Sequence, residues 1–314
     1  MFDFLFNISQ LTDFMGTGFR LSIPIAFAAL GGVLSERAGV YNIGLEGCVL
    51  SGAFGGAVGA VITGTPWGGV VFALLFAGMA GVVLATLSVL MRVNQIVAGI
   101  AINILMLGFT SYFARVFFPD GTASQNISGF KTFEIPLLSK IPILGQPLFN
   151  QDILFYSIYL LVPMAWWVMY RTPWGLQIRA IGEYPRAADT AGISVLKTRF
   201  VVVVISCALA GLGGAYIVLS QVFVFTENMS AGKGFVALAA LILGRWNPIG
   251  ALMAAVFFGF ADALQLRMQF SSPDVPYQFF AMLPYVASIL ALIVFAGKVK
   301  PPAALGLDFI RSGK

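Results

Sequence analysis

The sequence contains no histidine and only two cysteines, Cys48 and Cys207, each in an apolar stretch. Without histidine, the chain has too few ligands for a Cys/His metal site, and two cysteines cannot build a disulfide framework. We therefore expect no metal site and no zinc or redox chemistry. The lack of histidine and of clustered carboxylates also disfavours an enzyme, which needs a nucleophile, a base or a metal set.

Charged residues are scarce as well. Lys and Arg number 18 and Asp and Glu 13 in 314 residues, whereas 59% of the residues are hydrophobic. This is too little charge for the surface of a soluble protein of this size. Because a membrane-spanning helix uses about 20 mostly apolar residues, the composition is enough for roughly nine of them. The sequence predicts an all-α, polytopic transmembrane helical bundle that forms one domain over residues 1–314.

Dense apolar runs define the expected spans. They lie at 14–34, 43–62, 68–90, 95–118, 152–170, 200–220, 233–245, 249–268 and 278–296. The run at 233–245 is short, which indicates a half-helix or a re-entrant segment. About nine spans result, within a range of eight to ten. The first run lacks a basic leading region and a clear cleavage site, so we expect a permanent helix rather than a signal peptide.

The distribution of basic residues predicts the orientation in the membrane. Twelve of the 18 positive charges fall in the segments 35–42, 91–94, 171–199, 245–248 and 297–314. Since Lys and Arg are enriched in cytoplasmic loops, these segments should face the cytoplasm, with the N-terminus outside and the C-terminus inside. The net charge of +5 is then a property of those loops, and no nucleic-acid partner is expected.

Two connecting loops are long. The outer loop, at about 119–151, is rich in Pro, Gly and Ser and should form irregular structure or a short helix. The inner loop, at about 171–199, is polar and helical in pattern. Pro185 suits the first turn of a helix and Gly192 its end, so a short helix is expected at about 184–191. This helix either offers a docking surface to a cytoplasmic partner or lies on the bilayer as a connector.

Polar side chains at or inside the spans are candidates for a solute path, since each must face protein or water rather than lipid. These residues are Asn42, Glu46, Asn94, Gln95, Asn103 and Asn247. Glu46 has two interpretations: it locks helices together by capping a helix start or pairing with Arg37, or it shapes the inner end of the path with Asn42. Uncharged amides suit a neutral solute, although hydrogen bonds between helices also explain them.

Two further patterns have a structural interpretation. The glycines of the second span recur at the spacing Gly52/Gly56 and Gly55/Gly59, which permits close approach of two helices. Asp262 and Arg267 lie five residues apart in the eighth span. We interpret them as a structural pair, with contact to another protein as the alternative.

Three stretches together resemble one known family. They are ERAGVYNIGLEG at 36–47, TPWGLQIRAIGEYPRAADTAGI at 172–193 and GRWNPIGALMAAVFFGFADALQ at 244–265. The chain resembles the permease subunits of ribose/nucleoside-type ABC importers, and it is most similar to the shorter of the two permeases that pair in bacterial nucleoside importers. The likeness spans most of the chain and implies a type II-like ABC importer permease fold.

The resemblance also implies a coupling helix, which sits in a cleft of the ATPase subunit. Its pattern maps onto Gly182, Ala187, Ala188, Gly192 and Ile193, so the ATPase-coupling residues are expected to be Gly182, Glu183, Pro185, Arg186, Ala187, Ala188, Asp189 and Gly192. The implied partners are a second related permease, a cytoplasmic ATP-binding subunit and an extracytoplasmic substrate-binding protein or lipoprotein. The implied location is the bacterial cytoplasmic membrane.

The chain itself is expected to be non-catalytic. It contains no GxxxxGK[ST] phosphate loop, so ATP and Mg²⁺ should bind to the partner ATPase and no cofactor to this chain. Nucleosides are the expected solutes, with a simple sugar or riboflavin as alternatives within the same family. A gradient-driven secondary transporter is the alternative from another class, but it usually places ionisable residues in mid-membrane, whereas Glu46 and Asp262 sit nearer the span ends.

Overall fold

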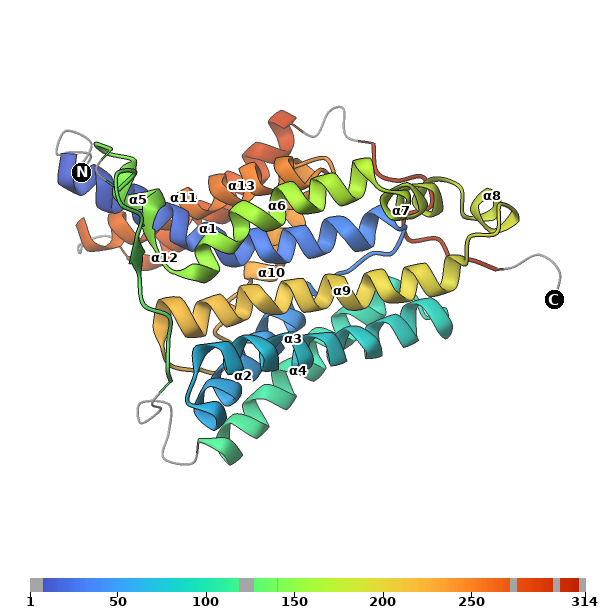
Figure 1. Cartoon of the computed structure of the whole chain (residues 1–314), viewed down its shortest axis with the longest axis horizontal. Helices are drawn as coiled ribbons and strands as arrows, with labels where there is room; N and C mark the ends of the chain where they lie inside the picture. The colour runs from blue at the N-terminus through green and yellow to red at the C-terminus, as the bar shows by residue number, and fades with distance from the viewer. Residues whose placement is uncertain (1–7, 119–126, 140, 272–275, 296–299, 311–314) are drawn as a thin grey trace.

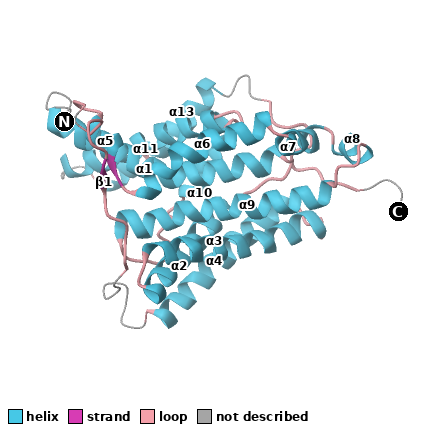
Figure 2. Ribbon diagram, viewed as in Figure 1, coloured by secondary structure: helices cyan, strands magenta, loops and turns pink. Residues whose placement is uncertain are grey.

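The computed structural model of the chain describes residues 8–118, 127–139, 141–271, 276–295 and 300–310. Within these ranges the chain is mainly helical, and its long helices run side by side in one bundle (Figures 1 and 2). Parts of the expected outer loop and of the expected cytoplasmic C-terminal segment, namely 119–126, 140, 297–299 and 311–314, lie outside the described residues.

The elements follow the apolar runs. In chain order they are α1 (Ile8–Arg37), α2 (Leu45–Thr63), α3 (Pro66–Ala85), α4 (Gln95–Phe117), β1 (Phe133–Glu134), α5 (Gly145–Phe149), β2 (Asn150–Gln151), α6 (Ile153–Arg171), α7 (Pro173–Glu183), α8 (Pro185–Thr190), α9 (Val195–Tyr216), α10 (Lys233–Leu243), α11 (Pro248–Ser271), α12 (Tyr277–Ala281) and α13 (Leu283–Phe295). Helices α3 and α9 continue as π-helical turns over Thr86–Leu90 and Ile217–Val222.

Not every apolar run forms a helix long enough to cross a membrane. Among the described residues, seven helices are long and apolar enough to cross a membrane: α1, α2, α3, α4, α6, α9 and α11. The expected seventh and ninth runs form shorter apolar helices, over Lys233–Leu243 and Gln278–Ala291. The half-helix expected at 233–245 is confirmed as α10, which has 11 residues.

Several helices begin at a polar side chain that caps their free backbone N–H groups. Asp152 accepts a hydrogen bond from Phe155 N at the start of α6, and Thr172 accepts one from Gly175 N at the start of α7. Such caps satisfy donors that have no partner inside the helix. They set the boundaries between α6, α7 and the segments that precede them.

The centre of the bundle consists of α1, α2 and α9. Most residues of these three helices are buried, whereas most residues of α3, α4, α6 and α11 are half-buried or exposed. Helix α1 packs on α9 and α11, and α2 packs on α3 and α9. Many of the exposed side chains on the outer helices are Leu, Ile, Val and Met, which suits contact with lipid or with another membrane subunit.

The two ends of the bundle are built differently (Figure 1). One end, named here the α8 end, consists of α7, α8, the C-termini of α1 and α6, the 244–247 turn and residues 300–310. The N-terminal end holds the start of α1 and the segment 127–151. In that segment, β1 and β2 pair antiparallel with Phe133 opposite Gln151. The short helix expected there is α5, while the strands were not expected because two residues are too few to show an alternating pattern.

Candidate functional site

Helix α8 confirms the short helix expected in the inner loop. Pro185 occupies its first turn, as the sequence predicted. Ala188 is buried and packs with Ile181, Val195 and Phe309, whereas Arg186 and Ala187 are exposed. One side of α8 is therefore held against the bundle, and the other side is free to contact another protein. Figure 1 shows α8 at the far end of the molecule from the N-terminus.

Gly192 ends this helix by its backbone conformation. Its φ is +86°, a value that residues other than glycine rarely adopt. The N–H of Gly192 donates to Asp189 O at 3.0 Å, and the N–H of Ile193 donates to Ala188 O at 3.0 Å. These bonds close the end of α8 and turn the chain into α9. A side chain at Gly192 would therefore strain the backbone, whatever the residue contacts outside the chain.

Gly182 and Glu183 hold α7 in place. Gly182 lies so close to the carbonyl of Arg37 that a Cβ atom would overlap it. The carbonyl of Gly182 accepts a hydrogen bond from Ala304 N at 2.8 Å, and Glu183 Oε2 accepts one from Ala303 N at 3.3 Å. These two expected coupling residues thus connect α7 to the end of α1 and to the C-terminal segment.

Residues 300–310, named here the C-terminal segment, connect the elements of the α8 end to one another by hydrogen bonds. Gly306 N donates to Gly39 O at 3.2 Å. Arg199 of α9 donates from Nε to Ala38 O at 3.0 Å and from Nη1 to Leu307 O at 2.8 Å. A cavity of about 400 Å³ separates this segment from the start of α8. The segment is thereby joined to the inner loop, to α9 and to the connection between α1 and α2.

The sequence did not indicate this role of the C-terminal segment. Leu305, Leu307 and Phe309 occupy every second position of this segment. This alternation is the one local signal in the sequence that could have indicated an extended segment with one side packed against the bundle. Phe309 is buried beside α8.

Asn42 is fully buried between α1 and α9. Its Nδ2 donates to Ser206 Oγ at 2.8 Å and lies 3.5 Å from Cys207 Sγ. Its Oδ1 has no hydrogen-bond partner among the described residues. Asn42 therefore connects the segment between α1 and α2 to the middle of α9.

Glu46 is buried and lies at the N-terminus of α10. Its Oε1 accepts hydrogen bonds from Ser230 Oγ at 2.6 Å and from Gly232 N at 2.8 Å, and its Oε2 accepts one from Gly234 N at 2.7 Å. The positive end of a helix dipole stabilises a carboxylate in this position. Glu46 therefore connects α2 to α10 by capping the start of α10, which is one of the two structural roles expected for it.

Gln95 and Asn103 attach α4 to the same connection between α1 and α2. Gln95 Oε1 accepts a hydrogen bond from Tyr41 N at 2.8 Å. Asn103 donates to Ile43 O at 2.9 Å and accepts from Gly47 N at 2.8 Å. With Asn42 and Glu46, these two amides therefore hold residues 41–47 against three helices.

The two remaining candidates lie at helix starts. Asn94 accepts hydrogen bonds from Ile96 N and Val97 N at the beginning of α4. Asn247 accepts one from Ile249 N, 2.9 Å away, at the beginning of α11. The structure therefore brings four of the six candidates together around residues 41–47 and leaves these two at separate helix ends. That any of the six lines a solute path stays a prediction.

Sequence reasoning missed a second buried acid, Glu36. Its Oε2 accepts a hydrogen bond of 2.6 Å from Trp246 Nε1. The adjacent Arg37 donates from Nε to Trp246 O at 2.8 Å rather than to Glu46. Trp246 and Arg245 both have positive φ values, of 52° and 56°. The turn between α10 and α11 is thus fixed to the end of α1 by two adjacent residues of opposite charge.

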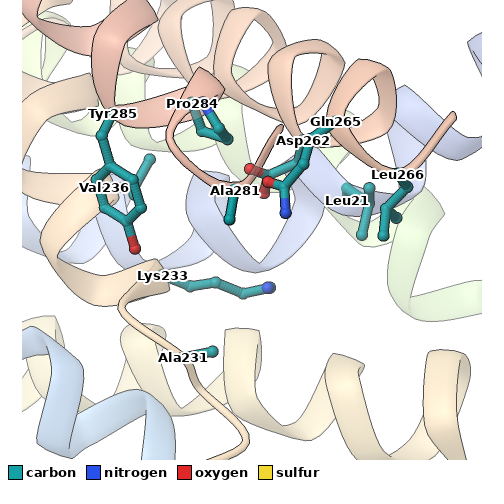
Figure 3. A pocket seen from close by; sticks show the side chains of 10 residues that line it. All are labelled: Leu21, Ala231, Lys233, Val236, Asp262, Gln265, Leu266, Ala281, Pro284 and Tyr285. Carbon is teal, nitrogen blue, oxygen red and sulfur yellow. The ribbon is translucent and has the colours of Figure 1, made fainter. Parts of the chain in front are cut away.

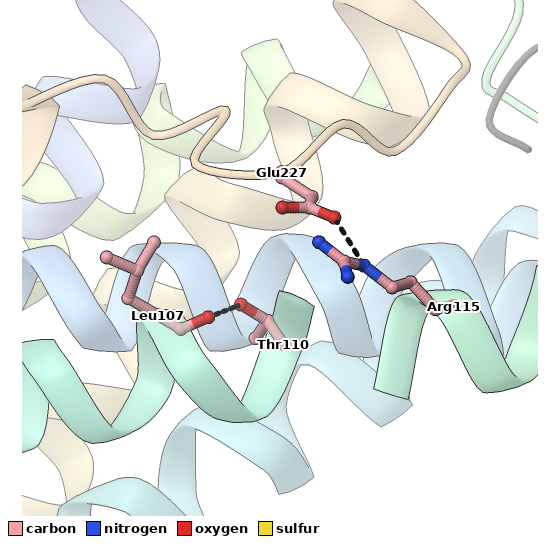
Figure 4. Close-up of polar contacts among 4 residues, drawn as sticks. All are labelled: Leu107, Thr110, Arg115 and Glu227. Atoms are coloured by element: carbon pink, nitrogen blue, oxygen red, sulfur yellow. Dashed lines mark hydrogen bonds and ion pairs between the residues drawn. The ribbon is translucent and has the colours of Figure 1, made fainter. Parts of the chain in front are cut away.

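An exposed ion pair connects α4 to the segment before α10. Arg115 Nε lies 3.1 Å from Glu227 Oε1 (Figure 4). A pair this exposed contributes about 0–1 kcal/mol, so its main effect is on position rather than stability. On the same helix, Thr110 Oγ1 bonds back to Leu107 O, which satisfies its hydroxyl inside the helix (Figure 4).

A cavity that contains three polar side chains, Lys233, Asp262 and Gln265, lies near the start of α10 and was also missed. Figure 3 shows Lys233 of α10 on one side and Asp262 and Gln265 of α11 on the other. Asp262 therefore faces Lys233, while Arg267 donates a hydrogen bond to Gln10 of α1 at 2.8 Å. In the described part of the chain, no group of three or more Asp, Glu or Cys side chains is placed to hold a metal ion.

Comparison with known proteins agrees with this architecture. The family model described as the permease component of a branched-chain amino acid transport system matches residues 14–296. The chain belongs to this permease family. The expected resemblance, the all-α membrane fold and the role of the chain as the permease component of an ABC transporter are thereby confirmed.

Individual relatives match over almost their whole length. The chain is 38% identical over 299 residues to the guanosine ABC transporter permease protein NupQ of Bacillus subtilis (strain 168), covering 92% of this chain and 93% of NupQ. It is 36% identical over 301 residues to the nucleoside ABC transporter permease protein NupC of Lactococcus lactis subsp. cremoris (strain MG1363), covering 93% and 94%.

A solved structure supports the fold. A chain of an ABC transporter assigned to the metal-chelate type, in an inward-facing conformation, superposes with a TM-score of 0.50. The two chains are 16% identical, and the match covers 90% of this chain and 87% of the other. At this identity the likeness concerns the arrangement of helices alone.

Proposed function

We propose that this chain is a permease subunit of an ATP-driven importer and forms the translocation path for nucleosides. The observation that carries the proposal is its identity of 38% to a guanosine permease and 36% to a nucleoside permease, in each case over more than nine-tenths of the chain. The similarity to these two permeases extends over the whole bundle, so it includes every helix that could line the translocation path. The chain is the non-catalytic subunit, and ATP and Mg²⁺ bind to the partner.

The ATP-binding subunit docks on the α8 end. Support comes from α8 itself, which exposes Arg186 and Ala187 while Ala188 anchors it to the bundle. The C-terminal segment lies beside α8 and is bonded to α7 and α9, so a force applied to α8 reaches the connection between α1 and α2. The expected coupling residues on and around α8 belong to this proposal.

The α8 end faces the cytoplasm, and the start of α1 faces outward. The described parts of the segments that carry most positive charges meet at the α8 end, where Arg37, Arg199 and Arg245 lie on three different elements. The positive-inside rule then gives an outer N-terminus and an inner C-terminus in the bacterial cytoplasmic membrane. A substrate-binding protein or lipoprotein delivers the nucleoside to the N-terminal end, and a second related permease packs beside this one.

A gradient-driven transporter is less consistent with two of the buried acids, Glu36 and Glu46. Glu46 has three hydrogen-bond donors around its carboxylate and Glu36 has the indole of Trp246. A carboxylate that must bind and release a coupling ion is not expected to be occupied by fixed donors of its own protein. A simple sugar or riboflavin remains the alternative solute within the same importer class.

Transport by the complete complex tests the proposal. The two permeases, the ATP-binding subunit and the binding protein are reconstituted in vesicles without an ion gradient, and uptake of radiolabelled guanosine, ribose and riboflavin is measured with and without ATP. We expect ATP-dependent uptake of guanosine only. Uptake of ribose or riboflavin but not guanosine would contradict the nucleoside assignment. A second set of vesicles receives an imposed ion gradient and no ATP, and uptake there would contradict the importer class.

A further inference from the structure

Two oppositely charged side chains face each other across a cavity of about 260 Å³ beside the start of α10. Lys233 extends from α10, and Asp262 extends from α11 toward it (Figure 3). Gln265 lies one turn beyond Asp262, and Tyr285 of α13 closes another side. The remaining wall is apolar and includes Val236.

The cavity lies at mid-depth in the bundle. Asp262 is the fifteenth of the 24 residues of α11, so the position near a span end that the sequence indicated for it is wrong. Asp262 is about 21 Å along α11 from Pro248, and Lys233 is about 15 Å along α10 from Leu243, at 1.5 Å per residue. Both distances start from the α8 end, and the hydrocarbon layer is about 30 Å thick. An ionisable side chain at this depth is costly and normally has a functional reason.

Lys233 and Asp262 differ from the other buried charged groups of the bundle. Glu36, Glu46 and Arg199 each have hydrogen-bond partners within the chain. Over the described ranges, neither the Lys233 ammonium nor the Asp262 carboxylate makes a hydrogen bond, and both groups are half-buried beside the cavity. Their hydrogen-bonding capacity is therefore available to something that enters.

The backbone around the cavity is also irregular. Residues 223–232, between the π-helical turn after α9 and the start of α10, are non-helical, and Phe223, Asn228 and Ala231 have positive φ values of 60°, 57° and 47°. Of these three residues, Ala231 lines the cavity. Non-helical backbone at membrane depth is tolerated where it is buried in protein or lines a water-filled cavity. Many secondary transporters place their solute sites at such interrupted helices near the membrane midplane. Because Glu46 already caps the start of α10, the open groups here are side chains rather than helix N–H groups.

We infer that this cavity is a transit site of the permease, at which Lys233 and Asp262 contact the hydroxyl groups of a passing nucleoside. This inference rests on the proposed function. The carboxylate of Asp262 accepts hydrogen bonds from ribose hydroxyls, and the ammonium of Lys233 donates to their oxygens. Gln265 can donate to and accept from a base edge, and the ring of Tyr285 offers a stacking face.

The size and charge of the site suit brief contact rather than tight binding. Its volume lies just below the range of about 300–1,000 Å³ typical of pockets that enclose a small ligand. One positive and one negative group leave the site without net charge, so it favours a neutral polyol over an ion. A solute must be able to leave as well as enter, which weak and distributed contacts permit.

The first test measures access to the cavity in the complete complex. The two native cysteines of this chain are fully buried, so in a complex whose other subunits have their cysteines replaced by serine the label reports a cysteine introduced at Leu266 or Ala281, both on the cavity wall. Each should react with a small hydrophilic thiol reagent, and guanosine with binding protein and ATP should slow the reaction about threefold or more. Leu137→Cys, at an 81% exposed position of the outer loop, is the control that guanosine should not protect. Equal rates with and without guanosine at both wall positions would overturn the inference.

The second test separates solute contact from a structural role. Asp262→Asn removes the charge with little change of shape and should lower guanosine import per ATP hydrolysed by about tenfold, the effect of one charge-assisted hydrogen bond. Import of 2′,3′-dideoxyguanosine, which lacks the hydroxyls, should change much less, and Asp262→Glu should restore part of the guanosine rate. Equal slowing of both solutes, or no change in either, would contradict the inference while leaving the proposed function intact. A wild-type complex that imports no guanosine would reject both.

Discussion

The carboxylate of Glu46 accepts a 2.7 Å hydrogen bond from the backbone N–H of Gly234, in the first turn of α10. A half-helix that starts inside a membrane protein exposes N–H groups that water cannot reach, and each such group is costly if it stays unpaired. Glu46 satisfies two of them, on Gly232 and Gly234, and also binds the hydroxyl of Ser230. The start of α2 therefore fixes where α10 begins.

Glu46→Gln should destabilise the permease. The glutamine amide has the same size as the glutamate side chain, but its NH₂ group cannot accept a hydrogen bond from the N–H and O–H donors that surround Glu46. The substitution also removes the negative charge at the N-terminus of α10. The expected loss is about 1.5–3 kcal/mol, the range for buried hydrogen bonds to a charged group. Retention of a monodisperse complex after heating, followed by size exclusion, measures it. Glu134→Gln, at an exposed position of β1, is the matched control and should melt as wild type.

Gly52→Ala should prevent close packing of α2 on α9. A Cβ atom at Gly52 would overlap the backbone of Gly211, which a flexible side chain cannot relieve. Overpacking of this kind costs about 1–3 kcal/mol. Gly108→Ala is the matched control, because a Cβ there meets no atom within 4 Å. A thermal midpoint for Gly52→Ala equal to that of Gly108→Ala would contradict the packing role of Gly52.

Ala187→Glu should uncouple transport from ATP hydrolysis without unfolding the chain. The residue is exposed on α8, so a larger charged side chain fits the isolated permease but obstructs a partner surface. We expect normal membrane insertion, loss of most nucleoside uptake and loss of solute-stimulated ATPase activity. Ala187→Ser, which keeps the residue small, should retain both activities. Wild-type uptake by Ala187→Glu would reject α8 as the docking element. Gly192 is unsuitable for this test, because its φ of +86° makes any side chain strain the backbone.

Arg199→Lys should release the C-terminal segment. The guanidinium reaches Ala38 O and Leu307 O at the same time, whereas a single ammonium cannot occupy both positions. Faster proteolysis within residues 300–310 and slower transport are expected, with about 1–3 kcal/mol lost at the α8 end. Lys197→Gln, at an exposed position of the same helix, should leave the cleavage rate unchanged. An unchanged rate in Arg199→Lys would show that other contacts suffice to hold the segment.

Two cysteine variants test the orientation. A cysteine at Ser128, at the N-terminal end, should react with an impermeant thiol reagent added to intact cells. A cysteine at Ser194, at the α8 end, should react only after the membrane is permeabilised. Cys48 and Cys207 are fully buried and give a low background. The reverse pattern would place the α8 end outside and remove the docking surface from the cytoplasm.

The sequence identified the features that depend on neighbouring residues. A run of about 20 apolar residues has no stable alternative to a membrane helix, so the long spans were predictable from composition alone. Helix α8 was predictable because Pro185 and Gly192 act within their own turns. The short seventh run was recognised as a half-helix from its length, although nothing local indicated what would cap its start.

The tertiary structure decided which polar groups pair and which stay open. Glu46 meets donors that lie 184 to 188 residues further along the chain, and Arg37 turns to the carbonyl of Trp246 rather than to Glu46. Likewise, Lys233 and Asp262 face a common cavity only because α10 and α11 pack against each other. Hydrophobicity determines that a segment enters the membrane. Because all transmembrane helices are similarly hydrophobic, this property does not specify which helices pack against each other. Hydrogen bonds and close backbone contacts do specify them, and these form only between surfaces that the fold brings together.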